Sequence, residues 1–219
     1  MRWVGCAMAA LSAGILLASC RFIPTDQVSA LTAAGGANGT AAHDPDQMVA
    51  SMWTAKVAPY FEKKAGPFLA VRDLAAKAPD EAGAKWGYRA KSEDTPWTLT
   101  VRIEGTIVAA DLESRAATIG VDASGKGKTE ATVQIGPAMR GTAIRDALDF
   151  VSFGDFTNQI DFARFGKAFN TYVNRNTLES LPRADLIGRK TTLIGAYALD
   201  SSGQPPLVTP VEITIGPKP

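Results

Sequence analysis

The sequence predicts an α+β fold, in which a helical lobe comes first and a β-barrel interrupted by a long helix follows. Three observations lead to it. Apolar residues alternate with polar ones in three short segments between residues 97 and 135, and tight turns join these segments. A long aromatic-rich helical pattern covers residues 155–178, and two more strand-like segments end the chain. Three strands, a helix and two strands are the plan of an OB-like five-stranded Greek-key barrel.

The composition limits the chemistry that the chain can support. Of its 219 residues, 46% are hydrophobic and 21% are charged, as in an ordinary globular protein. The net charge of +1 gives no broad basic field, so we expect no nucleic-acid partner. With two cysteines and one histidine, we expect neither a zinc site nor another metal or cofactor.

The first nineteen residues have the pattern of a lipoprotein signal peptide. Met1 and Arg2 precede an apolar run at 3–17, which is shorter than the ~20 residues that span a bilayer. The run ends in Leu-Ala-Ser before Cys20, which resembles the lipobox of bacterial lipoproteins. We therefore expect cleavage after residue 19, acylation of Cys20 and a lipid anchor on the periplasmic side of the envelope. The alternative is an ordinary signal peptide with an incidental cysteine.

Residues 20–43 are rich in Ala, Gly, Thr and Ser, and we interpret them as a flexible tether with a root-mean-square reach of roughly 25 Å. A helical lobe is predicted at 44–92. Asp44 is its expected first N-cap, and Pro59 is expected to kink or break the first helix. Two further prolines each start a helix, and Gly87 is expected to end the last of them in a left-handed cap.

The predicted barrel domain covers residues 93–219. Its strands are expected at residues 97–110, 116–121, 129–135, 191–199 and 208–215. Gly105 stands where a bulge or a bend is expected in the first strand, and Pro210 suggests an edge-like setting for the last. Between the third and fourth strands lies the predicted helix at 155–178, with Asp155 as its N-cap.

One glycine-rich segment resembles a phosphate-binding loop without meeting its requirements. Residues 120–126 match the Walker A spacing, but Gly127 stands where Ser or Thr is needed for magnesium. A true P-loop also runs from a strand into a helix, whereas this segment joins two predicted strands. We therefore interpret it as the tip of a hairpin.

Polar residues gather where the third strand ends and the long helix begins. They are Arg140, Arg145, Asp146, Asn158 and Gln159. Their donors and acceptors suit sugar hydroxyls, and nearby Phe150, Phe153 or Phe156 could stack on a sugar ring. The alternative is a structural network, with Arg145 holding a carboxylate or a carbonyl and Asn158 capping a helix. No nucleophile–base pair or close carboxylate pair is evident, so we expect no catalytic residue and no enzyme.

The mature chain resembles domain-of-unknown-function family 2291, a family of predicted periplasmic lipoproteins. The resemblance lies in the segments Cys20-Arg-Phe-Ile-Pro, 53–65, Ser114-Arg115, Ile135-Gly-Pro, Arg140-Gly-Thr, Arg145-Asp-Ala, 150–159, 188–195 and Thr209-Pro-Val. It implies a helical lobe with an OB-like barrel and a frequent association with ribose-type sugar uptake systems. It implies no established activity, so no catalytic residue is carried over.

Two functions remain open at this level. The first is a non-catalytic, membrane-anchored accessory of a sugar ABC-type uptake system, which binds the sugar or another component. The second is a stand-alone carbohydrate- or glycan-binding module of OB-like fold. A hydrolase is disfavoured, because the one histidine stands at the end of the predicted tether.

Overall fold

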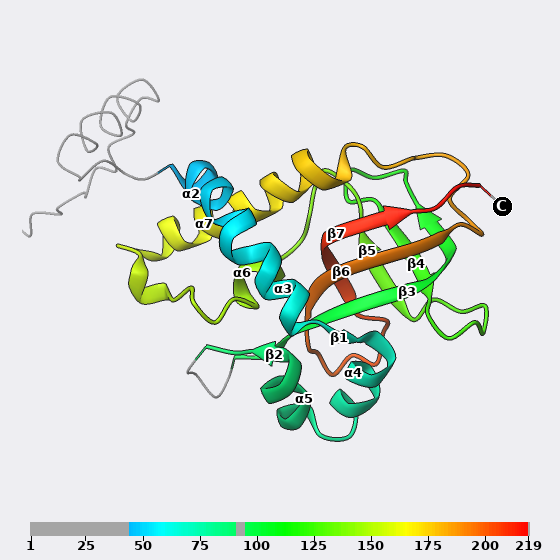
Figure 1. Ribbon diagram of the computed structural model, residues 1–219, viewed down its shortest axis with the longest axis horizontal. Coiled ribbons are helices and arrows are strands. Elements are labelled where there is room, and N and C mark those ends of the chain that lie inside the picture. Colours follow the sequence, from blue (N-terminus) through cyan, green and yellow to red (C-terminus); the bar gives the residue numbers. More distant parts are fainter. Residues whose placement is uncertain (1–43, 91–94, 219) are drawn as a thin grey trace, which may run out of the picture. The chain divides into compact units, whose positions relative to one another are not determined.

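The computed structural model describes residues 44–90 and 95–218 (Figure 1). The predicted signal peptide, Cys20 and the predicted tether lie outside the described residues. Within the described part, no helix combines the length and the apolar character needed to cross a membrane.

The barrel closes around one long strand, β3 (Thr98–Asp111). Its first half pairs with β6 (Lys190–Ala198) and its second half with β4 (Thr118–Asp122), both antiparallel. The sheet continues through β5 (Ala131–Gln134) and a short parallel pairing to β7 (Leu207–Ile215), which returns to β6. This order closes a five-stranded barrel and confirms the predicted OB-like fold, with the helical insertion between β5 and β6 (Figure 1).

Gly105 lies where β3 exchanges one partner for the other. At Gly105 and Thr106 the strand leaves β6 and begins to pair with β4. A Cβ atom on Gly105 would lie 2.4 Å from the carbonyl oxygen of Asp122. Only glycine permits this close approach of two backbones, as expected for a bend in a barrel strand.

Two short strands extend the sheet, one before and one after the helical segment at 68–86. β1 (Gly66–Pro67) pairs parallel with β3, and β2 (Gly87–Tyr88) pairs antiparallel with it. The predicted left-handed cap at Gly87 is wrong, because this residue has extended backbone angles, φ −134° and ψ −177°. Glycine serves a different need here, since a Cβ atom would lie 2.8 Å from Leu99 Cδ2.

The N-terminal helices follow one another closely. They are α2 (Pro45–Met52), the π-helical segment η1 (Trp53–Val57), α3 (Ala58–Lys64), α4 (Phe68–Ala75) and α5 (Pro79–Trp86). Asp44 caps α2 as predicted, by accepting a hydrogen bond from Asp46 N–H. The helix does not break at Pro59. Instead, Ala58 N–H donates to Trp53 O, five residues earlier, in a widened π turn. This turn accommodates the proline within a continuous helical segment.

The insertion between β5 and β6 begins with α6 (Ala143–Asp146) and a 3₁₀ turn, η2 (Phe153–Asp155). The long helix α7 (Gln159–Val173) follows and continues as the π-helical segment η3 (Asn174–Leu178). The sequence predicts Asp155 as the N-cap of the long helix, and this prediction is wrong. Asp155 closes a capping box with Ser152 in η2, and Asn158 caps α7 by accepting from Asp161 N–H at 2.9 Å.

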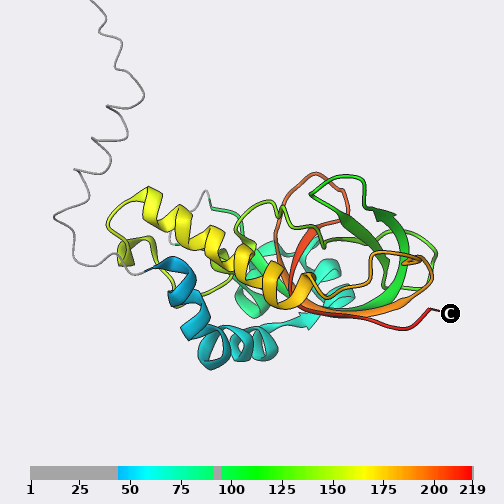
Figure 2. The same ribbon diagram turned by 90° about the horizontal axis from the view of Figure 1, so that it is seen from above.

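The N-terminal helices divide between two hydrophobic cores. Helices α4 and α5 place Phe68, Val71 and Ala82 in the barrel core, against Leu99 and other inward residues of the strands. In contrast, α2, η1 and α3 pack with α6 and α7 against the outer face of β6 and β7 (Figure 2). The second core contains a cluster of aromatic rings, in which Trp53 stacks on Tyr172 at 4.4 Å.

Candidate functional site

Arg145 and Asp146 form the centre of a closed polar network on α6. The guanidinium donates to Asp146 Oδ1 from Nε at 2.8 Å and from Nη2 at 2.6 Å. It also donates to the carbonyl oxygen of Phe162 at 2.9 Å and to Thr142 Oγ1 at 3.1 Å. Thr142 in turn donates to the second oxygen of Asp146 at 2.6 Å. These contacts tie α6 to α7 and use most of the donors of Arg145.

Residues of α7 pack closely around the guanidinium of Arg145. The guanidinium carbon lies 3.7 Å from the centre of the Phe162 ring, in a cation–π arrangement. On the other side stands Gly166 of α7, where a Cβ atom would lie 2.9 Å from Arg145 Nη1 and 2.7 Å from Thr142 Cγ2. The arginine side chain is therefore enclosed, and only 10% of it is exposed.

The other three predicted site residues lie elsewhere. Asn158 and Gln159 stand at the exposed start of α7, where Asn158 also donates to Asp161 Oδ2 at 2.9 Å. Arg140 is exposed, and its backbone rather than its side chain is held, by two hydrogen bonds with the side chain of Gln134. The structure thus brings Arg145 and Asp146 together and leaves Arg140, Asn158 and Gln159 apart from them.

In the hairpin tip between β4 and β5, a side-chain carboxylate binds the backbone N–H groups of the loop. The carboxylate of Asp122 accepts from the backbone N–H groups of residues 124–127, at 2.6 to 3.2 Å. Burial raises the pKa of Asp122, but these four donors outweigh it and hold the pKa below its usual value. The nest of N–H groups that would cradle a phosphate in a P-loop is occupied by this side chain.

A large cavity opens where α4 and α5 meet the barrel. Its volume is about 1060 Å³, and the connection between β6 and β7 lies beside α4 in the same region (Figure 1). Its wall is largely apolar and contains four prolines, together with Ala75, Ala76 and Leu199. Its polar groups are those of Arg72, Thr129, Glu130, Tyr197, Asp200, Ser201 and Gln204. Such a mixture of an apolar wall and several polar groups is typical of a small-molecule site.

An ion pair joins the two sides of this cavity. Arg72 of α4 donates to Glu130 Oε1 at 2.8 Å, and Glu130 Oε2 accepts from the backbone of Ser124 at 2.7 Å. Burial raises the pKa of Glu130, but the hydrogen bonds from Arg72 and Ser124 hold it below its usual value. Both charged residues therefore remain ionised at neutral pH while they border open space.

Tyr197 of β6 lines the same cavity from the barrel side. The residue is almost fully buried. Burial raises the pKa of Tyr197 to about 12, and the nearby positive charge of Arg72 lowers it only in part. The phenol therefore stays protonated and can donate a hydrogen bond to a ligand.

A comparison with models of protein families identifies the family of this chain. A family model described as predicted periplasmic lipoprotein (DUF2291) matches residues 10–214. The chain belongs to this family. This match confirms the resemblance that the sequence indicated. The family description also supports a periplasmic, lipid-anchored location.

A solved structure supports the fold of this DUF2291 protein independently. The chain is similar to an OB-fold protein from Thermotoga maritima, with a TM-score of 0.61 over 79% of this chain and 98% of the other. At 16% identity the likeness concerns the fold alone. No curated protein matches the chain significantly.

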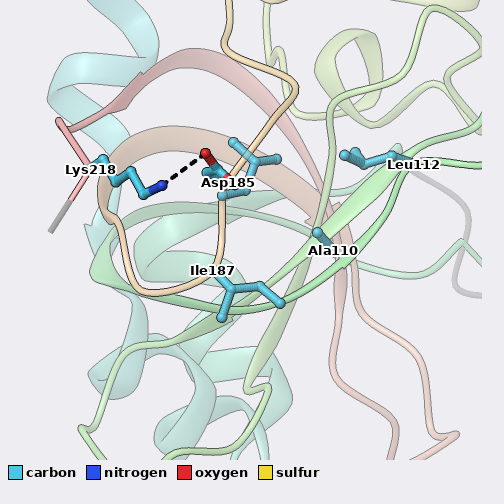
Figure 3. Close-up of a pocket in the computed structure, with 6 residues that line it drawn as sticks. Ala110, Leu112, Asp185, Ile187 and Lys218 are labelled. Atoms are coloured by element: carbon cyan, nitrogen blue, oxygen red, sulfur yellow. Dashed lines mark hydrogen bonds and ion pairs between the residues drawn. The ribbon is translucent and has the colours of Figure 1, made fainter.

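A smaller hollow lies beside the end of β3, where Ala110 and Leu112 face the loop that carries Asp185 and Ile187 (Figure 3). An ion pair of 3.0 Å between Lys218 and Asp185 closes one side of it. Its volume, about 500 Å³, is half that of the cavity beside α4. It offers few polar groups, so we regard the larger cavity as the candidate site of this DUF2291 protein.

The larger cavity is not evident from the sequence. Arg72 and Glu130 are 58 positions apart, and neither stands in a recognisable motif. The four prolines could have served as an indication, because Pro79 starts α5, Pro96, Pro205 and Pro206 lie in irregular segments, and all four line this cavity. In the described residues, no group of three or more His, Cys, Asp or Glu side chains is placed to hold a metal ion.

Proposed function

We propose that this protein is a non-catalytic, lipid-anchored accessory of a sugar ABC-type uptake system, and that the cavity beside α4 holds the sugar. The observation that carries the proposal is the cavity itself. It offers apolar walls and several hydrogen-bonding groups on a closed barrel, as a sugar requires. The association with sugar uptake comes from the resemblance to the family and is tested below.

The charges of the cavity favour a neutral, hydroxyl-rich ligand. Arg72 pairs with Glu130 at 2.8 Å and with Asp73 at 3.0 Å, so neither Arg72 nor Glu130 offers an unpaired charge to an ionic ligand. Their remaining donor and acceptor positions can still bond hydroxyl groups. Asp200 accepts hydrogen bonds from its neighbour Ser202, at 2.7 and 3.0 Å. A neutral sugar can be bound by such groups without separating an ion pair.

The pKa values of the ionisable groups in the cavity favour ligand binding over catalysis. The pKa of Glu130 is lowered and that of Tyr197 is raised, so each moves away from the neutral range in which a general acid or base works best. The cavity groups are therefore suited to hold a ligand and poorly suited to exchange protons with it. Acylation of Cys20 would keep such a binding protein at the membrane that contains the transporter.

Uptake by a deletion strain tests the proposal. Initial uptake rates of labelled pentoses and hexoses are compared between the deletion strain and strains that carry wild-type protein, Tyr197→Phe or Gln159→Ala. We expect reduced uptake of a ribose-type sugar, restored by wild type and by Gln159→Ala but poorly by Tyr197→Phe. Uptake that is unchanged for every sugar would remove the proposed role.

The size of the cavity favours one second candidate, a stand-alone glycan-binding module. About 1060 Å³ lies at the upper end of the usual range for ligand pockets, which leaves room for more than one sugar ring. A glycan array probed with the purified lipoprotein would detect such binding. Loss of signal in Gln204→Ala, but not in Gln159→Ala, would locate it in the cavity, and an array without signal would exclude it.

A further inference from the structure

Exposed apolar side chains gather at the start of α7. Among the described residues, the large hydrophobic side chains that are exposed are Leu112, Phe150, Phe153, Ile160 and Ile187. Three of them stand in one stretch of chain around η2 and the first turn of α7. Phe153 and Ile160 are 53% and 64% exposed. We call Phe150, Phe153 and Ile160 the α7-tip surface.

The two aromatic rings of the α7-tip surface each pack against another aromatic ring of the protein. Phe153 packs edge-on against Phe162, with ring centres 5.6 Å apart, and Phe150 packs in the same way against Tyr60 at 5.5 Å. The capping box of η2 and the Asn158 cap fix the backbone between them. The chain thus presents these apolar groups to solvent on a rigid support, and a partner that covered them would gain hydrophobic free energy.

A shallow hollow of about 470 Å³ continues this surface along α7. Gln159, Ile160, Ala163, Arg164 and Lys167 line it, at the spacing of one helix face. The two basic residues are balanced by acidic ones nearby. Arg164 pairs with Asp161 at 3.6 Å, and Asp149 and Asp155 also belong to this end of the molecule. Contact with this surface therefore depends on apolar burial rather than on charge.

The chain outside the structure ends on the helical layer that carries this surface. Residue 44 leads directly into α2, which lies along α7 through the Trp53–Tyr172 stack and an ion pair between Asp46 and Arg175. Both contacts lie at the C-terminal end of α7, roughly 20 Å along the helix from Ile160. The predicted tether at 20–43 has a root-mean-square reach of roughly 25 Å as a coil. Acylation of Cys20 would therefore keep a bilayer within reach of this layer, at a high effective concentration.

We propose that the α7-tip surface rests on the lipid bilayer to which Cys20 anchors the protein. Phe153 and Ile160 enter the interface between headgroups and acyl chains, to a depth of about 5–10 Å, as an interfacial helix does. Arg164 and Lys167 stay at headgroup level with their long side chains. This contact orients the barrel and its cavity relative to the membrane. It depends on the lipid anchor but not on sugar binding.

The experiment uses the full lipidated protein, purified from membranes and reconstituted into phosphatidylcholine vesicles that contain a nitroxide-labelled lipid. Acylation of Cys20 is verified first by mass spectrometry, so that a failed anchor is recognised separately. Cys6 leaves with the predicted signal peptide, and Cys20 is blocked by lipid. A single introduced cysteine can therefore carry a fluorescent label, either in Ile160→Cys or in Ile187→Cys. Ile160 and Ile187 are matched, at 64% and 65% exposure.

We expect the nitroxide lipid to quench the label at 160 at least about twofold more strongly than the label at 187, because only the first enters the interface. Adding Phe153→Glu should remove the difference, while Glu104→Gln on β3 should preserve it. Equal quenching at both positions would overturn the proposal. So would a label at 160 that is shielded from both the lipid quencher and aqueous iodide, since a protein partner or a second copy would then cover it.

Discussion

Two arginines in this molecule have the same kinds of neighbours and different surroundings. Arg145 contacts a carboxylate, Asp146, and lies 3.7 Å from the centre of the Phe162 ring. Arg72 contacts two carboxylates, Glu130 and Asp73, and lies 5.7 Å from the centre of the Phe68 ring. However, Arg145 has 10% of its side chain exposed, whereas Arg72 has 35% exposed and borders a cavity of about 1060 Å³.

A cluster of polar residues can bind a ligand only where open space lies beside it. Around Arg145, Gly166 and Phe162 occupy the space that a ligand would need, and a backbone carbonyl takes one of the donors. Arg72 also donates to Asp73 from Nε and Nη2, but prolines, Tyr197 and open volume lie beyond these ion pairs. The first arrangement stabilises the contact between two helices, and the second leaves hydrogen-bonding groups available.

The largest expected effect is on stability, and it should separate the two arginines. Arg145→Met removes a buried cation and leaves Asp146, Thr142 and the Phe162 carbonyl without their donor. We expect a loss of about 2–3 kcal/mol in the free energy of unfolding. Arg72→Met should cost only about 1 kcal/mol, because Arg72 is 35% exposed and Glu130, itself 13% exposed, keeps its hydrogen bonds from the backbone of Ala123 and Ser124.

Urea denaturation of both variants measures this difference. Equal losses in the two variants would mean that the two clusters do not differ in structural role. A larger loss for Arg72→Met than for Arg145→Met would reverse the comparison.

A smaller effect is expected from closing the space beside Arg145 still further. Gly166→Ala replaces glycine by the better helix former, yet its Cβ atom would lie 2.7 Å from Thr142 Cγ2 and 2.9 Å from Arg145 Nη1. We expect a net loss of about 1–2 kcal/mol, because crowding outweighs the gain in helix propensity.

Gly154→Ala is the matched control for Gly166→Ala. The only neighbour that its Cβ atom would meet is Ser152 Oγ at 3.8 Å, so the melting temperature should barely change. If Gly166→Ala stabilised the protein, α6 and α7 would have to be able to move apart.

The sequence was sufficient for the barrel because its strands follow simple rules. Leu99, Val101 and Ile103 alternate with polar residues and are all fully buried, and Gly105 stands at the bend of β3. The N-cap of α7 was misplaced by three residues, since Asp155 and Asn158 are both good caps. What decides between them is the extended backbone of Phe156, which ends η2 and delays the helix.

The cavity could not be predicted, because tertiary contacts create it. Arg72 lies on α4, and Glu130 lies at the start of a strand on the opposite side of the opening. The sequence pattern assigns α4 to the helical lobe predicted at 44–92, and only the structure shows that Phe68 and Val71 of α4 pack in the barrel core. Local patterns predict which face of an element is buried, but not which neighbour buries it.

The smallest expected change in stability concerns Tyr197→Phe, and it tests whether the cavity is a site at all. The substitution keeps the ring and removes one hydroxyl, so the free energy of unfolding at pH 7 should change by less than about 0.5 kcal/mol. At alkaline pH the variant should be more resistant than wild type. The pKa of Tyr197 is about 12 in the folded protein, above the ordinary value of 10. The stability that this difference provides is complete below pH 10 and is lost as the pH rises to 12.

Urea midpoints between pH 8 and pH 12 measure this dependence, with Tyr172→Phe as a control from the aromatic cluster around Trp53. A steeper alkaline loss in wild type than in Tyr197→Phe would establish that the hydroxyl stays protonated and buried at the edge of the cavity. If both lost stability equally, the hydroxyl would be solvated, and its value as a fixed donor for a ligand would disappear. Such a result would leave the ring of Tyr197 as a packing group, much as Phe162 is for Arg145.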